Sequence, residues 1–143
     1  MTEPTDETDK PSALPFETLD FIYTPSRDVA KEVAYFIDVL GGRLAFAIEG
    51  MGTRVAMVEL ADAPPRLLFA DHVTGERPIL IYRVAALGQA LTALEARGWK
   101  REATLEIPPG PCSSFTTPGG HRIAVYERTR GFVEDSFRGR RDF

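Results

Sequence analysis

The feature that most constrains the fold is a strand–helix–strand–strand–strand pattern that occurs twice along the chain. In the first copy, a β-prone run at 19–24 precedes a helical pattern at 29–40, which Gly41 and Gly42 end. Three further strand candidates follow at 43–49, 53–60 and 66–71, separated by turn-forming residues.

The second copy repeats this order. A strand at 78–84 leads to a helical stripe of Leu87, Leu91 and Leu94, which ends at Gly98. Strand candidates at 99–105, 112–117 and 121–126 follow, with breaks at 108–111 and 118–120. Placing Gly41 on Gly98 gives an offset of 57 residues. Because solenoids need at least three repeats, the pattern predicts one duplicated α+β domain.

Composition narrows the function classes. The chain has 143 residues, enough for one domain, with a net charge of −4 and a single cysteine, Cys112. Without a basic cluster, nucleic-acid binding is disfavoured. No apolar run approaches the ~18 residues of a membrane span, and the acidic start does not resemble a signal peptide. One cysteine excludes a disulfide within the chain and favours a cytoplasmic location.

The two ends differ from the repeated core. Residues 1–18 carry five acids and three prolines, which predicts a disordered acidic tail. Residues 128–143 carry five arginines together with Phe132, Phe137 and Phe143. Because aromatic rings carry large apolar areas, we expect this Arg/Phe-rich tail to pack on the body or on a second subunit. The alternative is a solvated tail.

Several short motifs keep a fixed order across residues 19–128. In the first copy they are Asp28, residues 34–36 (Ala-Tyr-Phe) and residues 39–42 (Val-Leu-Gly-Gly). In the second they are Arg83-Val84, Leu87, Leu94, Ala96, Gly98 and the turn at 115–123. This set resembles the vicinal oxygen chelate superfamily, which includes glyoxalase I, extradiol dioxygenases, methylmalonyl-CoA epimerase, and fosfomycin- and bleomycin-resistance proteins. The resemblance implies two tandem βαβββ modules, 19–71 and 78–127, which form a curved, cup-like mixed sheet with helices outside.

Metal enzymes of the superfamily place four ligands on the concave face of the sheet. By resemblance, the corresponding positions here are Phe21, Leu68, Ile79 and Ala124. None of these side chains has a lone pair to donate to a divalent ion. We therefore expect no metal ion and no other cofactor.

Other residues near the strand ends could rebuild a metal site. The candidates are Asp20, Glu59, His72, His121 and Glu127. Because side chains alternate along a strand, Asp20 and Glu127 should point away from the cup if Phe21 and Ala124 point into it. A shift of one residue in the register would reverse this and restore a site for Zn, Ni, Mn or Fe.

Without a metal, the concave face becomes an apolar cup that could bind a small molecule. Its expected ligand-binding lining is Phe21, Tyr23, Met57, Leu68, Ile79, Ile81, Arg83, Phe115, Ala124 and Tyr126. The two tyrosines would orient a ligand, and Arg83 could meet an anionic group. Alternatively, the protein's own side chains, the Phe-bearing tail or a second subunit fill the cup. Trp99 is expected under the second helix, and Cys112 as a buried residue without a nucleophilic role.

Three functions follow from the resemblance. The first is a metal-independent binder of a hydrophobic or aromatic small molecule, similar to bleomycin-resistance proteins and homodimeric like many of them. The second is an enzyme, such as a glyoxalase-like lyase, an isomerase or a dioxygenase, which uses replacement metal ligands or metal-free acid/base residues; no catalytic residue can be assigned. The third is a regulatory protein-interaction module. The fold alone does not choose among them.

Overall fold

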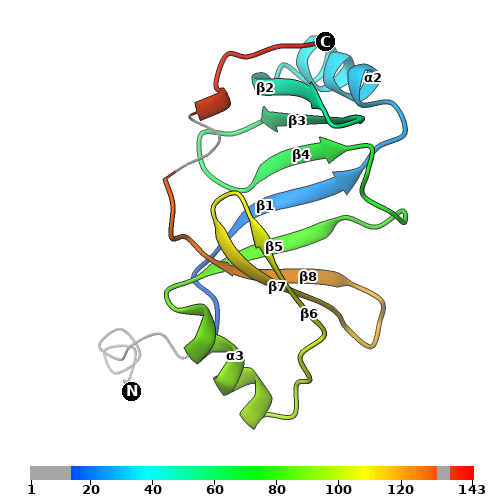
Figure 1. The fold of residues 1–143 in the computed structure, drawn as a ribbon. Coiled ribbons are helices and arrows are strands. Elements are labelled where there is room, and N and C mark those ends of the chain that lie inside the picture. Colours follow the sequence, from blue (N-terminus) through cyan, green and yellow to red (C-terminus); the bar gives the residue numbers. More distant parts are fainter. Residues whose placement is uncertain (1–13, 132–135) are drawn as a thin grey trace, which may run out of the picture.

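One mixed, eight-stranded sheet forms the body of the protein in the computed structural model, which describes residues 14–131 and 136–143. The strand order is β2-β3-β4-β1-β5-β8-β7-β6 (Figure 1). The strands are β1 (Thr18–Pro25), β2 (Arg43–Gly50), β3 (Thr53–Glu59), β4 (Arg66–Ala70), β5 (Ile79–Val84), β6 (Ala103–Ile107), β7 (Gly110–Thr116) and β8 (Arg122–Glu127).

The sheet is built from two equivalent halves. β1 pairs with β4 in parallel, and β5 pairs with β8 in parallel, so that each half has the same internal order. The halves join through the antiparallel pair β1–β5 at the centre. The α+β fold with two tandem βαβββ modules is therefore confirmed.

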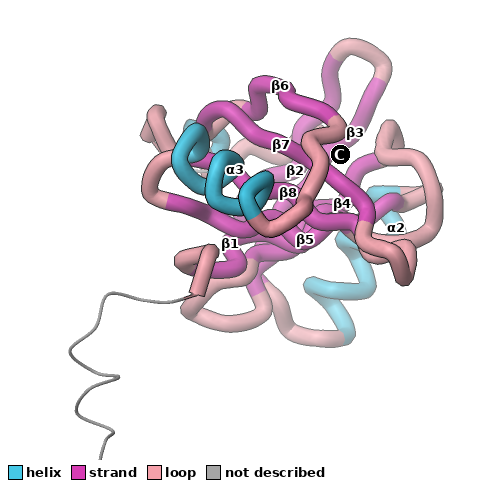
Figure 2. Tube along the Cα trace, turned by 90° about the horizontal axis from the view of Figure 1, so that it is seen from below, coloured by secondary structure: helices cyan, strands magenta, loops and turns pink. Residues whose placement is uncertain are grey.

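The helices cover one face of the sheet. α2 (Val29–Ala34) and the π-helical turn η1 (Tyr35–Val39) replace the single helix expected at 29–40. The Asp28 carboxylate caps α2 by accepting the backbone N–H of Lys31 at 3.1 Å. α3 (Leu87–Ala96) belongs to the second module, and both helices lie outside the strands (Figure 2). No helix in the described ranges is long and apolar enough to cross a membrane.

The opposite, concave face holds the largest buried apolar cluster. It includes side chains from strands near both edges of the sheet, namely Phe46 of β2 and Cys112 of β7. Phe21 and Ile81 from the central strands lie between them. The sheet is thus curved enough for its two ends to share one core.

Two details of the second module differ from the predictions. β6 begins at Ala103 and not at Trp99, because the Trp99 ring packs under α3, as expected for that side chain. Phe115 was expected on the concave face, but it packs against the α3 cluster with its ring edge-on to Trp99. Alternation explains this, because Cys112 takes the concave face and the residue three positions along must take the other.

The described residues of both tails are in contact with the body of the protein. Residues 1–13 of the predicted disordered tail lie outside the described residues. Within that tail, however, Phe16 packs on Tyr82 with ring centroids 5.2 Å apart. The Glu17 backbone N–H donates to Arg83 O at 2.9 Å.

The expected packing of the C-terminal tail on the body is confirmed for residues 136–143, which we call the strap. The strap runs along the free edge of β2, where Ala47 N donates to Arg140 O at 2.9 Å and Arg141 forms a parallel bridge with Ala47. Figure 1 shows its end beside α2 and β2. Phe137 joins the concave cluster, and Phe143 packs against the α2 cluster. Phe132 lies outside the described residues.

Candidate functional site

The structure brings together eight of the ten residues expected to line the cup. They belong to the concave cluster or pack directly on it: Phe21, Tyr23, Met57, Leu68, Ile79, Ile81, Ala124 and Tyr126. Five of them are buried and form a closed floor, with exposed fractions between 0 and 5%. Tyr23 of β1, Leu68 of β4 and Ile79 of β5 are half-buried, and Tyr23 pairs in register with each of the other two. These three residues, with Ile48 and Val55 of β2 and β3, define what we call the mouth of the concave face.

Arg83 lies at the end of the concave face opposite the mouth, where two carboxylates neutralise its charge. Its Nε is 3.5 Å from Asp20 Oδ2 and 3.7 Å from Glu17 Oε1. The Tyr126 hydroxyl donates a short hydrogen bond to the Asp20 carboxylate. Burial and this hydrogen bond raise the pKa of Tyr126, so the phenol stays protonated. Asp20 and Tyr126 are buried and Arg83 and Glu17 reach the surface, so this group is a structural polar network at the end of the concave face away from the mouth.

The position of Asp20 corrects the expectation that it points away from the cup. The pairing of β1 with β5 is irregular between Leu19 and Phe21, and this bulge lets Asp20 share a side with Tyr126. Glu127 does point away, as expected. Its carboxylate accepts the backbone N–H of Leu87 at 2.8 Å, at the start of α3.

Glu59, a candidate replacement ligand, is held by three arginines. Its side chain is 2% exposed, and Arg66 Nε, Arg43 Nε and Arg138 Nη2 lie 2.7, 2.8 and 3.2 Å from its oxygens. Burial alone would raise the pKa of this carboxyl, but the hydrogen bonds from the arginines outweigh it and lower the pKa to about 2. A carboxylate so fully paired is a structural ion cluster and leaves little room for a metal ion.

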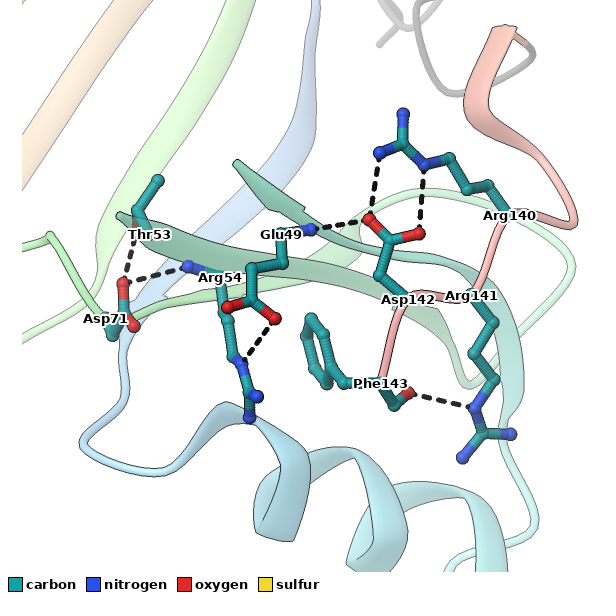
Figure 3. Close-up of polar contacts among 8 residues, drawn as sticks. All are labelled: Glu49, Thr53, Arg54, Asp71, Arg140, Arg141, Asp142 and Phe143. Carbon is teal, nitrogen blue, oxygen red and sulfur yellow. Dashed lines mark hydrogen bonds and ion pairs between the residues drawn. The ribbon is translucent and has the colours of Figure 1, made fainter. Parts of the chain in front are cut away.

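A chain of four polar side chains borders the mouth. The Tyr23 hydroxyl is 3.1 Å from His72 Nε2, and His72 Nδ1 is 2.8 Å from Thr53 Oγ1. Thr53 Oγ1 in turn donates to Asp71 Oδ1 at 2.5 Å, and Arg54 N donates to the same oxygen at 3.1 Å (Figure 3). Of these residues, sequence reasoning proposed Tyr23 as a lining residue and His72 as a metal ligand, but not their connection.

Two cavities flank this region. One of about 720 Å³ lies beyond the carboxyl ends of the parallel strands β1 and β4, lined by residues 25–27, Asp71, Val73, Gly75 and Glu76. Another of about 180 Å³ lies over the second module, where Ile79, Ser114, Thr116 and Arg122 contribute to its wall. The smaller cavity includes Ile79 of the mouth in its wall, whereas the larger one is lined by residues at and beyond the ends of β1 and β4.

The chemistry of the remaining candidates is limited. In the described part of the chain, no three His, Cys, Asp or Glu side chains gather closely enough to hold a metal ion. Phe21, Leu68, Ile79 and Ala124 carry hydrocarbon side chains, which offer no lone pair to a metal ion. Cys112 is buried, and burial raises the pKa of its thiol to about 11, which keeps it unreactive.

Two tandem βαβββ modules around one curved sheet, with a concave face opposite the helices, constitute the vicinal oxygen chelate fold. Solved structures agree with this. Methylmalonyl-CoA epimerase from Mycobacterium tuberculosis has a TM-score of 0.67 at 16% identity, covering 85% of this chain and 95% of its own. A hypothetical protein from Bacillus halodurans has a TM-score of 0.67 at 10% identity, covering 80% of this chain and 96% of its own.

A variant of Streptomyces coelicolor methylmalonyl-CoA epimerase, in complex with 2-nitronate-propionyl-CoA, has a TM-score of 0.64 at 13% identity, covering 80% of this chain and 99% of its own. No family model matches the sequence, and no curated protein matches it. The comparisons therefore establish the fold of this chain, and its function has to be argued from the site.

Proposed function

We propose that the protein binds a small organic molecule with an apolar or aromatic body at the mouth of the concave face, without a metal ion or other cofactor. The observation that carries this proposal is the half-buried group of Tyr23, Leu68 and Ile79 over a fully packed floor. Small-molecule sites are typically apolar and concave, with a few polar groups that set orientation. The Tyr23–His72 pair supplies such polar groups at the edge of the mouth.

The closed floor narrows the set of residues that we propose as ligand contacts. Phe21, Ile81 and Tyr126 support the mouth from below and are too deeply buried to contact a guest directly. Of the ten residues predicted to line the site, we therefore retain Tyr23, Leu68 and Ile79 as direct contacts.

The first test is native mass spectrometry of the purified protein. A metal-free mass that carries a co-purified organic ligand supports the proposal and identifies a first guest. A metal adduct that a chelator removes would contradict metal independence. The same spectrum gives the oligomeric state. We expect a homodimer, in which a second copy could cover Val39 and Leu40, apolar side chains that are 65% and 47% exposed.

A matched pair of variants locates the site. Ile79→Ala and Leu80→Ala remove the same number of carbon atoms at adjacent, partly buried positions of β5, on opposite faces of the sheet. We expect Ile79→Ala to weaken the binding of a hydrophobic fluorescent dye about tenfold, and Leu80→Ala to leave it within about twofold. Equal effects of the two variants would place the dye elsewhere.

An enzyme is the second candidate function. The observation that favours it is the hydrogen-bonded chain from Tyr23 to Asp71, because a phenol and an imidazole in contact can move a proton to and from a bound substrate. On this view Tyr23 and His72 would act as metal-free acid/base residues of a lyase or isomerase. Turnover that is lost in both Tyr23→Phe and His72→Ala, and unaffected by a chelator, would establish it.

A further inference from the structure

The direction of the hydrogen bonds at the mouth can be worked out from its charged end. Hydrogen bonds from the Thr53 hydroxyl and the Arg54 backbone N–H lower the pKa of Asp71, so its carboxyl group is ionised at neutral pH. An ionised carboxylate only accepts hydrogen bonds, so Thr53 must donate its single proton to Asp71. Figure 3 shows Thr53 directed at this carboxylate.

The next two contacts follow from that first one. Thr53 Oγ1 has no proton left, so in its 2.8 Å contact with His72 it accepts from Nδ1–H. Neutral imidazole carries one proton, which leaves Nε2 as an acceptor. The 3.1 Å contact between Nε2 and Tyr23 is therefore a hydrogen bond donated by the phenol. All three protons in the chain point away from the mouth and toward Asp71.

Tyr23 consequently faces the mouth with oxygen lone pairs and no available proton. We propose that the mouth selects ligands that carry a hydrogen-bond donor, a phenolic or enolic hydroxyl or an N–H group, on an apolar body, and that Tyr23 Oη accepts this hydrogen bond. This inference rests on the proposed function and specifies the ligand class.

The same arrangement disfavours the opposite class of ligand. A carbonyl or ether oxygen placed against Tyr23 would bring two acceptors together, and the unmade hydrogen bond in this half-buried location costs affinity. Burial raises the pKa of Tyr23, which keeps the phenol protonated and able to donate its hydrogen bond to His72 Nε2. Selectivity thus arises from a fixed acceptor and not only from apolar contact.

The test compares probes with the same aromatic body. 2-Naphthol donates a hydrogen bond, whereas 2-methoxynaphthalene and naphthalene do not. At pH 8 we expect 2-naphthol to bind about five- to tenfold more tightly than 2-methoxynaphthalene, as measured by fluorescence titration. Tyr23→Phe should remove this preference, because it deletes the acceptor oxygen. Tyr82→Phe, on the helix-covered face, is the matched control and should preserve it.

His72→Ala provides the second variant. Without Nε2, the Tyr23 proton becomes available to the mouth, and we expect 2-methoxynaphthalene to gain affinity until the two probes bind within about twofold. If wild type shows no preference while all probes bind saturably, the inference is overturned and the proposed function stands. If no probe binds, the proposed function fails, and the inference with it.

A measurement without any ligand tests the chain itself. Ring nitrogen chemical shifts from ¹⁵N NMR distinguish the two neutral tautomers of His72 at pH 8. We expect the form protonated on Nδ1, and Thr53→Val should abolish this preference by removing the acceptor. The opposite tautomer in wild type would mean that Tyr23 Oη accepts a hydrogen bond from His72 Nε2–H, which would overturn the inference.

Discussion

At the residue scale, the interior contains charged groups whose partners are already complete. Glu59 and Asp20 both face the concave side, yet the first is bound by three arginines and the second by Tyr126 and Arg83. These groups affect the stability of the fold, because removing one partner leaves the other charge buried and unpaired. Their effects should therefore be visible in stability measurements and not in ligand binding.

Glu59 makes stability dependent on pH in the acid range. Its pKa is lowered from 4.5 to about 2 in the folded protein, so its stabilisation is complete above about pH 4.5 and is lost as the pH falls toward 2. The total loss is about 3 kcal/mol. Urea unfolding between pH 5 and pH 2 should show this slope in wild type and a much flatter one in Glu59→Gln. Identical slopes would mean that other carboxyl groups dominate.

Tyr126→Phe tests the second network. The substitution deletes the hydroxyl that donates to Asp20 and leaves a buried carboxylate with one fewer donor. We expect a loss of about 1–3 kcal/mol in the free energy of unfolding. Tyr82→Phe, with its ring on Phe16, should change it by less than about 0.5 kcal/mol. Denaturant titration of both variants measures these free energies of unfolding. Equal losses in the two variants would mean that the Tyr126–Asp20 hydrogen bond does not stabilise the fold.

At the scale of elements, the close approach of β7 and β8 depends on glycine. A Cβ built on Gly110 would lie 1.9 Å from the carbonyl oxygen of Glu127, a backbone atom that cannot move aside alone. Gly110→Ala should therefore destabilise the protein by more than about 3 kcal/mol. Gly88→Ala is the contrasting change, because nothing lies within 4 Å of that Cβ in α3. It should stabilise by about 0.5–1 kcal/mol, measured by thermal unfolding.

Most helices and strands were predictable from the sequence, but the β-bulge that changes which face a side chain takes was not. Alternation predicted which residues of β1, β4, β5 and β8 share the concave face, because a regular strand preserves parity. The bulge near Asp20 broke that parity, and no local pattern marked it. The same limit applies to the polar chain. Thr53 and His72 become neighbours only through the pairing of β3 with β4, which a single sequence does not specify.

At the scale of the whole molecule, the two modules share one sheet. The central β1–β5 pair and the concave cluster both combine side chains from the two halves. Neither half can unfold without exposing the core of the other, so we expect a single cooperative transition. Trp99 fluorescence reports the second module and far-UV circular dichroism reports both. Their urea midpoints should coincide, and separate midpoints would show that the modules unfold independently.

The strap has a further consequence for how the protein behaves at high concentration. By hydrogen bonding to Ala45 and Ala47, it occupies backbone groups of β2 that would otherwise be available to any passing strand. An uncovered edge strand is a template for aggregation and for exchange of segments between chains. β6, at the other edge, is short, and four of its five residues are exposed, which makes it a poor template. The strap therefore makes the edge of β2 unavailable for pairing with a strand of another copy.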